Sequence, residues 1–368
     1  MMKTAPNMLG SHRIVRARAP LRISFAGGGT DVEPYCGERG GAVLSSTINR
    51  FAYATVLPAA DTISVQSVDY DATFRCSAND PFIYDGQLDV AKRVVDYFRA
   101  TNCLEEGIDV YLHNDAPPGS GLGSSSAITV ALLRALASES RLPLDNYELA
   151  ELAFHIERID SGIAGGKQDQ YASVFGGFNF IEFLDGVVVV DALRVPPETL
   201  WELEYSLVFG YLGGSHFSSR IIEKQMENYR VGSQDAVDAM DALKELAYEM
   251  KRALILGELG DFGDLLHESW QCKKRMAEGI TTDRIDEVYE AARKAGALGG
   301  KIPGAGGGGF MLFFCQPGKV FAVQETLVKA GVELAHFSFT GSGATSWVVN
   351  DKGNGRVATA IYGRDHVS

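Results

Sequence analysis

The stretch Pro117–Ala127, PPGSGLGSSSA, is the part of the sequence that decides the fold. It follows a short apolar run, Ile108–Leu112, that is typical of a strand, and it opens into Ser124–Ser140, whose apolar residues recur at helical spacing. Glycines let the backbone turn several N–H groups toward one point, and the start of the helix adds a partial positive charge. This combination predicts an anion site suited to phosphate. The plainer alternative, a capped helix after a turn, requires one serine rather than three serines and three glycines.

The same stretch lacks the lysine of the commonest phosphate loops. A Walker A loop has the pattern G-x-x-x-x-G-K-[ST], in which the lysine reaches the phosphates. The sequence therefore excludes the ordinary P-loop class of nucleotide-hydrolysing protein. If the loop binds phosphate, the charge must be neutralised by a metal ion, by the helix dipole or by a basic residue elsewhere in the chain.

Two further glycine clusters stand at Ser24–Asp31, SFAGGGTD, and at Lys301–Phe310, KIPGAGGGGF. The second contains G-x-G-x-x-G at Gly304, Gly306 and Gly309, the pattern of a dinucleotide-binding loop. That function requires a strand before the glycines and a helix after them. Here FMLFF, an apolar run typical of a strand, follows the glycines. The sequence therefore disfavours a dinucleotide-binding oxidoreductase and favours a loop that passes close to something bulky.

Composition limits the function further. The 368 residues carry a formal net charge of −13, which argues against nucleic acid as a partner because phosphate backbones attract basic surfaces. No apolar run reaches the roughly 18–20 residues that a membrane-spanning helix needs. Five cysteines, an odd number without C-x-x-C or zinc spacing, are typical of reduced thiols in the cytoplasm. We therefore expect a cytoplasmic protein that binds neither nucleic acid nor membrane.

The pattern along the chain predicts an α+β protein in two lobes. The first lobe starts as a sheet, because three stretches are rich in strand-forming residues: Ile14–Phe25, Ala42–Leu57 and Thr62–Cys76. The second is expected to begin with a strand, Tyr205–Leu212, and to continue with long helices. Pro196-Pro197 is the best candidate for the boundary. We therefore predict two domains, residues 14–195 and residues 196–368.

The three glycine clusters together resemble motifs 1, 2 and 3 of the GHMP kinases, the family of galactokinase, homoserine kinase, mevalonate kinase and phosphomevalonate kinase. Motif 2 of that family is close to P-x-x-x-G-L-G-S-S-A-A, and this chain has P-P-G-S-G-L-G-S-S-S-A. The order and spacing of all three motifs agree over residues 14–350. The family's phosphate loop has no Walker lysine, which accounts for its absence here.

The resemblance implies a two-lobed fold, with an N-terminal ribosomal protein S5 domain 2-like lobe and a C-terminal ferredoxin-like lobe, and an activity that uses ATP and Mg²⁺. Three stretches look like the D-glycero-D-manno-heptose 7-phosphate kinases and their relatives, the L-fucokinase-type sugar kinases: APLRISFAGGGTDVEPY, GGKQDQYASVFGGFNF and ALGGKIPGAGGGGF. The heptose branch phosphorylates the anomeric C1 hydroxyl of the 7-phosphate. Its 1,7-bisphosphate product feeds nucleotide-activated heptose for bacterial surface polysaccharide.

Carried onto this chain, the resemblance assigns the nucleotide and metal roles. Ser125 corresponds to the family's metal-ligating serine, and Glu157, in HIERIDSG, to its metal-ligating glutamate. The plainer alternative for Glu157 is a surface carboxylate paired with Arg158 or Lys167. The nucleotide is assigned to the loop residues Pro118, Gly119, Ser120, Gly121, Leu122, Gly123, Ser124, Ser125 and Ser126.

The resemblance also assigns the residues around the transferred group. Asp169, in GGKQDQYA, corresponds to the catalytic aspartate, and Arg22 to a basic position near the transferred group. On the residues alone, Asp169 could cap a helix and Arg22 could form a surface ion pair. Asp31 corresponds to a residue that binds sugar hydroxyls, with a simple turn residue as its alternative. The substrate-binding set is Gly28, Gly29, Thr30, Asp31, Lys167, Gly306, Gly307 and Lys273.

A 7-phosphate also needs a positive pocket at the far end of the sugar. The candidates are Lys167, Lys273, Lys274 and Arg275, because charge-assisted donors suit phosphate. The plainer alternative for the stretch CKKR is a solvated helix face. His216 departs from related sugar kinases, which tend to carry an arginine nearby. The adenine pocket is expected between about residues 50 and 100.

We therefore predict a kinase that uses ATP and Mg²⁺ and takes a small-molecule sugar phosphate, with a homodimer as an open option. The alternatives within the class are an L-fucokinase-like or other anomeric sugar kinase and, less favoured by GGGTD and GGKQDQ, a mevalonate kinase. From another class, the chain could be a catalytically inactive ligand-binding protein on the same fold. The intact Asp169, Glu157 and Ser125 argue against that alternative.

Overall fold

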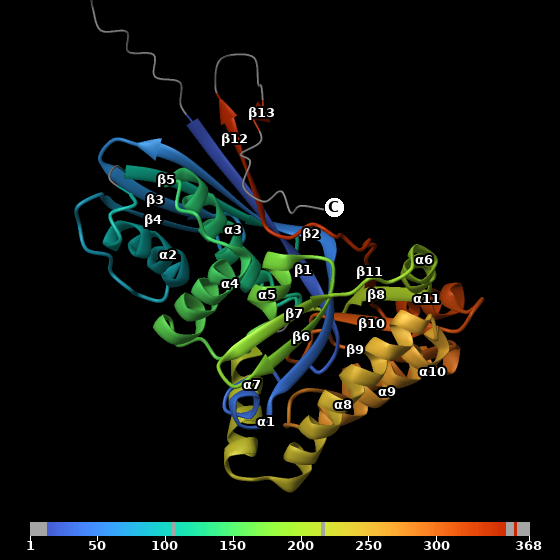
Figure 1. The fold of residues 1–368 in the computed structure, drawn as a ribbon. Coiled ribbons are helices and arrows are strands. Elements are labelled where there is room, and N and C mark those ends of the chain that lie inside the picture. The colour runs from blue at the N-terminus through green and yellow to red at the C-terminus, as the bar shows by residue number, and fades with distance from the viewer. Residues whose placement is uncertain (1–12, 105–106, 215–217, 351–356, 359–368) are drawn as a thin grey trace, which may run out of the picture.

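The computed structural model describes residues 13–104, 107–214, 218–350 and 357–358 (Figure 1). These residues form two β-sheets with helices packed against them, which confirms the expected α+β protein in two lobes. Each described helix is too short or too polar to span a bilayer. The five cysteines, all within the described ranges, are unpaired.

The larger sheet has the strand order β13-β12-β1-β2-β5-β3-β4, and β6 pairs with β2 and β7 beside this path. Its strands are β1 (Arg13–Ala26), β2 (Gly41–Ala59), β3 (Thr62–Ser67), β4 (Ala72–Ser77), β5 (Gly107–Asn114), β6 (Phe178–Leu184), β7 (Val187–Ala192), β12 (Thr345–Asn350) and β13 (Val357–Ala358).

The long strands β1 and β2 lie at the centre of this sheet and are largely buried. All residues from Ala19 to Ala26 of β1 are buried, including the polar Arg22 and Ser24. A strand covered on both faces is usually apolar throughout. Arg22 is therefore an exception, and its guanidinium must find partners inside the protein.

The smaller sheet has the order β11-β8-β10-β9, with β8 (Leu207–Tyr211), β9 (Ala297–Lys301), β10 (Phe310–Cys315) and β11 (Glu333–Leu334). The run FMLFFC of β10 is buried at every residue. Phe310, Leu312 and Phe314 pack into the core shared with the larger sheet, whereas the intervening residues pack into a second core under the C-terminal helices. The continuous apolar run therefore reflects burial on both faces of the strand.

Helices cover both sheets. In Figure 1, α2, α3, α4 and α5 lie together against the larger sheet, and α9 and α10 lie beside the smaller one. Helix α8 packs on α9 and against β1 and β2 of the larger sheet. The helical segments are α1 (Tyr35–Arg39), α2 (Asp89–Ala100), α3 (Ser124–Glu139), α4 (Asn146–Phe154), η1 (His155–Asp160), α5 (Gln168–Phe175), α6 (Pro197–Ser206), α7 (Ser218–Arg230), α8 (Gln234–Leu256), α9 (Leu259–Arg275), α10 (Asp283–Ala295) and α11 (Val320–Lys329).

Three expectations about local structure were incomplete. Thr62–Cys76 is a hairpin of two strands, because Asp71 turns the chain with a positive φ of 45°. The sequence pattern also predicts a helix over Tyr147–Ile159, and in the structure this helix changes at His155 into the π-helical turn η1. The second half begins with helix α6, and the strand expected from Tyr205 starts at Leu207.

The chain returns to the larger sheet near its end. Strand β12 pairs antiparallel with β1, from Arg18 opposite Thr345 to Arg13 opposite Asn350. This pairing joins residues more than 300 positions apart and carries no local sequence signal. The division into residues 14–195 and 196–368 stays a prediction, with β12 as a strand that the second region contributes to the sheet of the first.

Candidate active site

The glycine-serine loop ends at the N-terminus of α3. Gly119, Gly121 and Gly123 have φ of 76°, 81° and 72°, a left-handed region that favours glycine. Gly123 is the N-cap of α3, and no side chain caps this helix. The plainer alternative of a serine-capped helix is therefore wrong. The first N–H groups of α3 remain available to an anion, as the phosphate hypothesis requires.

The third glycine cluster lies directly against this loop. A Cβ at Gly304 would come within 2.7 Å of Gly121 Cα, and a Cβ at Gly309 within 2.5 Å of Ser120 O. The backbone N–H of Phe310 donates to Ser120 O at 3.1 Å. The bulky object that the third cluster was expected to pass is therefore the glycine-serine loop itself.

Glu157 is fully buried and accepts three hydrogen bonds. Ser125 Oγ donates to its Oε1 at 2.9 Å, Ser126 Oγ to its Oε2 at 2.7 Å, and Gln170 Nε2 to its Oε2 at 2.7 Å. Glu157 is thus not a surface carboxylate, although its pairing with Arg158, which the plainer alternative expected, is present, with Arg158 Nη1 3.4 Å from Oε1. A buried carboxylate needs such donors or a cation to offset its desolvation. Two of these donors, Ser125 and Ser126, come from the start of α3 at the proposed phosphate site, and the third comes from α5.

Asp169 and Arg22 form an ion pair beside the loop. Arg22 Nε and Nη2 lie 2.8 Å and 2.7 Å from Asp169 Oδ1, and Arg22 Nη1 donates to Gly121 O at 2.7 Å. Asp169 does not cap α5, whose N-cap is Lys167 and whose N-terminus has no side-chain cap bond. Both plainer alternatives, a helix cap and a surface ion pair, therefore fail: Arg22 is only 4% exposed and fixes the carboxylate against the loop.

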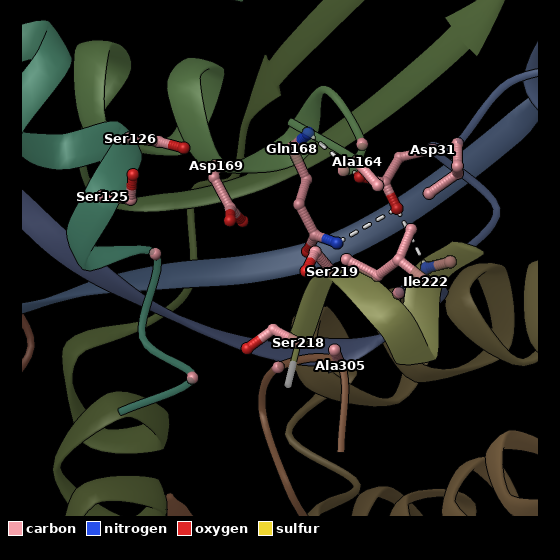
Figure 2. Close-up of a pocket in the computed structure, with 18 of the residues that line it drawn as sticks. Asp31, Ser125, Ser126, Ala164, Gln168, Asp169, Ser218, Ser219, Ile222 and Ala305 are labelled. Carbon is pink, nitrogen blue, oxygen red and sulfur yellow. Dashed lines mark hydrogen bonds between the residues drawn. The ribbon is translucent and has the colours of Figure 1, made fainter. Parts of the chain in front are cut away.

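Asp31 lies across the cavity from Ser125 and Ser126 (Figure 2). Its carboxylate is buried and accepts from the backbone N–H groups of Gly29 at 2.9 Å and Gln168 at 3.1 Å, and from Gln168 Nε2 at 3.0 Å. A Cβ at Gly166 would overlap this carboxylate. Asp31 is therefore held rigidly by three donors and by a glycine that leaves it room.

These groups line one cavity of about 190 Å³. It is bounded by Arg22, Gly28, Gly29, Asp31, the loop glycines, Ser124–Ser126, Glu157, Asp169, residues 163–166, Ser218, Ser219, Gln225, Lys273, Gly304 and Ala305. In Figure 2, Ser125, Ser126 and Asp169 lie on one side, and Asp31 and Ile222 lie on the other. One wall thus offers serine hydroxyls and the Glu157 and Asp169 carboxylates, and the opposite wall offers other polar groups.

Donors gather on that opposite wall. Lys273 Nζ is buried, donates to Gly28 O at 2.9 Å and lies 3.4 Å from Gln225 Oε1. Burial lowers the pKa of Lys273 to about 8, against the opposing effect of Asp31. Within the described part of the chain, Gln225 Nε2 is buried without a hydrogen-bond partner. This end of the cavity is therefore suited to an anionic or oxygen-rich ligand.

A second cavity, of about 580 Å³, adjoins the first and shares Ser124, Ser125 and Ile163 with it. It lies between the β3–β4 turn, the start of α2 and one face of α3. Its lining includes Ser67, Tyr70, Leu88, Val90, Leu112, Pro118, Ile128 and Thr129. The two chambers therefore meet at the start of α3, and the lining of the larger one combines apolar side chains with polar ones.

Comparison with known proteins identifies this arrangement. The model of the GHMP kinase N-terminal domain matches residues 89–177, and the model of the GHMP kinase C-terminal region matches residues 250–333. A D-glycero-alpha-D-manno-heptose 7-phosphate kinase of Campylobacter jejuni is 37% identical over 340 residues, which cover 91% of this chain and 99% of that protein. The chain belongs to the GHMP kinase family. It is an ATP-dependent sugar kinase of the heptose phosphate kinase branch, as the sequence predicted.

Solved structures agree with the GHMP kinase fold. A D-glycero-D-manno-heptose 1-phosphate kinase from Bacteroides thetaiotaomicron superposes with a TM-score of 0.76 at 35% identity, covering 90% of this chain and 98% of that one. The galactokinase of Lactococcus lactis, at 20% identity and a TM-score of 0.70 over 90% of this chain and 95% of that one, shows the same fold. The family assignment confirms the expected fold and excludes the oxidoreductase alternative.

Several residues assigned to this kinase site from its sequence do not line the first cavity. Thr30 closes a turn, since its hydroxyl donates to Gly27 O at 2.8 Å. Gly306 and Gly307 pack against Ile280. Lys167 lies 3.4 Å from Glu33 Oε1. The other residues outside this lining are Ser120 and Leu122, which are buried, and Pro118, which lines the second cavity.

Of the basic stretch CKKR, only Lys273 reaches the cavity. Lys274 pairs with Asp286 at 3.3 Å, and Arg275 pairs with Asp235 on an exposed face. The solvated-face alternative therefore describes these two residues but not Lys273. His216 lies outside the described residues.

Sequence reasoning gave no role to four side chains that the structure brings to this site: Arg158, Gln168, Gln170 and Gln225. A signal existed for Gln168 and Gln170, which flank Asp169 in GGKQDQYA. Lys301 was also missed. It is buried, donates to Phe25 O at 3.1 Å, and has its pKa lowered to about 7 by burial and by the neighbouring Lys273 and Arg22.

Proposed function

We propose that this kinase transfers the terminal phosphoryl group of ATP to the anomeric C1 hydroxyl of D-glycero-D-manno-heptose 7-phosphate, giving the 1,7-bisphosphate for nucleotide-activated heptose biosynthesis. The observation that carries the proposal is a cavity with a carboxylate–arginine pair beside a phosphate loop on one wall and buried donors on the other. The heptose 7-phosphate kinase named above, a full-length relative, supports the same acceptor.

Asp169 is the proposed catalytic residue. Both bonds from Arg22 fall on Asp169 Oδ1, and within the described residues Oδ2 accepts none. That oxygen is available to orient the acceptor hydroxyl and take its proton. Arg22 holds the carboxylate in place from the inside of β1. Phosphoryl transfer depends chiefly on such positioning and on charge stabilisation.

The two cavities suit the two substrates. We place the phosphates of ATP on the backbone of Gly119–Ser126, between the two chambers. The adenine then belongs in the larger cavity, with Tyr70 and Leu88 on one side and Ile128 on the other. Half of that lining falls within the expected residues 50–100, and the other half comes from later residues, chiefly of α3 and the loop before it. The acceptor belongs in the smaller cavity, with its hydroxyls on Asp31 and Gln168.

Ser125 and Glu157 are the proposed ligands of Mg²⁺. Magnesium prefers hard oxygens and usually takes only one or two from the protein, with the rest from phosphates and water. The hydroxyl of Ser125 and the carboxylate of Glu157 already meet at 2.9 Å at the end of the phosphate loop, so the donor set fits. Mg²⁺ bound there would neutralise charge on the phosphates.

Glu157→Gln is expected to raise the Mg²⁺ concentration that gives half-maximal activity by about tenfold or more, because one anionic ligand is lost. Calorimetry should show that ADP binding loses its dependence on Mg²⁺. Glu249→Gln, on an exposed face of α8, is the matched control. An unchanged Mg²⁺ requirement would remove Glu157 from the metal site.

The 7-phosphate is assigned to Lys273, Gln225 and the start of α7 at Ser218 and Ser219. Lys273 contributes charge, and Gln225 Nε2, which has no partner among the residues that the structure describes, contributes a buried donor. Charge-assisted donors of this kind suit phosphate better than hydroxyls.

The acceptor phosphate should make activity sensitive to pH through Lys273. Below its pKa of about 8 the ammonium is charged and binds phosphate, and above that pH it loses its proton. We therefore expect kcat/KM for the phosphorylated heptose to fall as pH rises through about 8, since this parameter reports the free enzyme. In Lys273→Met the value should be low and this fall absent. If unphosphorylated heptose gave the same pH profile, the fall in kcat/KM would have to come from a group other than Lys273 at the acceptor phosphate.

ADP release from a panel of acceptors tests the function: D-glycero-D-manno-heptose 7-phosphate, mannose 6-phosphate, L-fucose, galactose and mevalonate, each with ATP and Mg²⁺. We expect turnover with the phosphorylated heptose and none with Asp169→Ala. Preferred turnover of free L-fucose or galactose would be consistent with a sugar kinase but would contradict heptose 7-phosphate as the acceptor. An L-fucokinase/L-fucose-1-P guanylyltransferase of Bacteroides fragilis is 28% identical over 89% of this chain and 37% of its own length, so L-fucose is the sharpest competitor.

A further inference from the structure

Arg158 extends from the π-helical turn η1 into the first cavity, next to the serines of α3. Its Nη2 donates to Ser126 Oγ at 3.2 Å, and its Nη1 lies 3.4 Å from Glu157 Oε1. The side chain is 11% exposed. The guanidinium is therefore held at the wall that carries the proposed phosphate and metal groups.

The glycine at position 165 is explained by this arginine. A Cβ at Gly165 would overlap Arg158 Cζ and lie 2.6 Å from Nε and 2.7 Å from Nη1. The φ of Gly165 lies outside the left-handed region, so the backbone conformation alone does not require glycine. What requires it is the close approach of the guanidinium. The next residue, Gly166, leaves room for Asp31 in the same way, so the segment separates Arg158 from the acceptor wall.

The cationic side chains of the cavity differ in how many of their donors have hydrogen-bond or ion-pair partners. Arg22 is occupied by Asp169 and by Gly121 O. Lys273 lies on the acceptor wall, on Gly28 O. Within the described ranges, Arg158 Nε is buried with no hydrogen-bond partner. A buried donor without a partner is costly unless a ligand satisfies the group. Arg158 is thus an incompletely paired cation beside a phosphate loop that lacks a lysine.

We infer that Arg158 is a second catalytic cation, whose guanidinium contacts the oxygens of the terminal phosphoryl group of ATP, and that Gly165 is the positioning residue that admits it. The inference rests on the proposed placement of the nucleotide phosphates. During transfer the bond from the terminal phosphorus to the bridging oxygen of ADP breaks, the bond to the acceptor oxygen forms, and the acceptor proton goes to Asp169. Arg158 keeps its protons and stabilises charge on the moving group, as an arginine does in other phosphoryl-transfer enzymes.

Nucleotide binding tests this inference independently of turnover. Calorimetry with Mg²⁺ compares ADP with AMP-PNP, a non-hydrolysable analogue that carries the terminal phosphoryl group. For Arg158→Gln we expect the Kd for AMP-PNP to rise about tenfold, the loss of one charge-assisted bond, and the Kd for ADP to change by less than about twofold. The kcat should fall about 100-fold, with partial recovery in Arg158→Lys.

Gly165→Ala displaces the guanidinium without removing its charge and should reproduce the selective loss of AMP-PNP affinity. Adding Gly165→Ala to the Arg158→Gln variant should lower the AMP-PNP affinity little further, because both changes remove the same guanidinium contact. Gly341→Ala, where a Cβ meets nothing within 4 Å, is the matched control.

Three results would overturn the inference: an unchanged kcat, an equal loss of ADP and AMP-PNP affinity, or a rise in acceptor KM alone with AMP-PNP affinity kept. The last would place Arg158 on the acceptor. Because both nucleotides bind without an acceptor, a wrong acceptor assignment would leave this comparison readable.

Discussion

Replacing Asp169 with asparagine is expected to lower kcat about 1,000-fold while leaving the KM for both substrates within a small factor. Asparagine keeps the size of the side chain and can still receive a hydrogen bond from Arg22 through its oxygen. It cannot accept the acceptor proton. The measurement is steady-state ADP release with ATP, Mg²⁺ and heptose 7-phosphate, together with nucleotide binding by calorimetry.

Asp185→Asn, in the exposed turn between β6 and β7, is the matched control for this substitution and should behave as the unmodified enzyme. If Asp169→Asn retained full kcat, Asp169 would be an orienting partner of Arg22 and nothing more. The proton would then have to leave through another group, and the proposed mechanism would be wrong.

Gly166→Ala is expected to lower kcat/KM for the sugar about 100-fold, the scale on which a displacement of about 1 Å costs activity. The Cβ of the new alanine would overlap the buried carboxylate of Asp31. That carboxylate cannot move aside without losing hydrogen bonds, because three donors hold it in place. Either Asp31 or the segment that carries Gln168 must move. The KM for ATP should change little, because Asp31 lies on the acceptor wall.

The thermal midpoint of Gly166→Ala distinguishes a lost acceptor site from a lost fold. We expect a loss of a few degrees at most, since the change affects a loop at the cavity. A collapse of nucleotide binding together with the midpoint would show that Gly166 supports the fold rather than the acceptor.

The glycine motifs made the fold and much of the site predictable, because they act locally. A left-handed φ at Gly119, Gly121 and Gly123 and an uncapped helix start are properties of one short stretch. The sequence alone did not reveal why the third cluster is so rich in glycine. For Gly304 and Gly309 the reason is their contact with Gly121 and Ser120, which lie nearly 200 residues earlier in the chain.

Lys273 shows what periodicity could have added. It continues the buried stripe of α9 that runs through Phe262, Leu266 and Trp270, whereas Lys274 and Arg275 fall off that stripe. Helical spacing alone therefore separates the one cavity lysine from its two solvated neighbours. The stretch CKKR, treated as one basic cluster, hid that difference.

Other features could not be predicted because they depend on distant parts of the chain. The pairing of β12 with β1 and the approach of Gln225 to Lys273 are decided by packing between elements. No sequence motif singled out Arg158. Its proposed role as a phosphate-binding cation follows only from its contacts with Ser126 and Gly165.

The most direct test of the central claim is phosphorus NMR of the product formed from ATP, Mg²⁺ and D-glycero-D-manno-heptose 7-phosphate. We expect the signal of the original phosphate to persist and a second signal to appear, coupled to the anomeric proton at C1. A second phosphate on any other carbon, or product from free sugars but not from the 7-phosphate, would contradict the account.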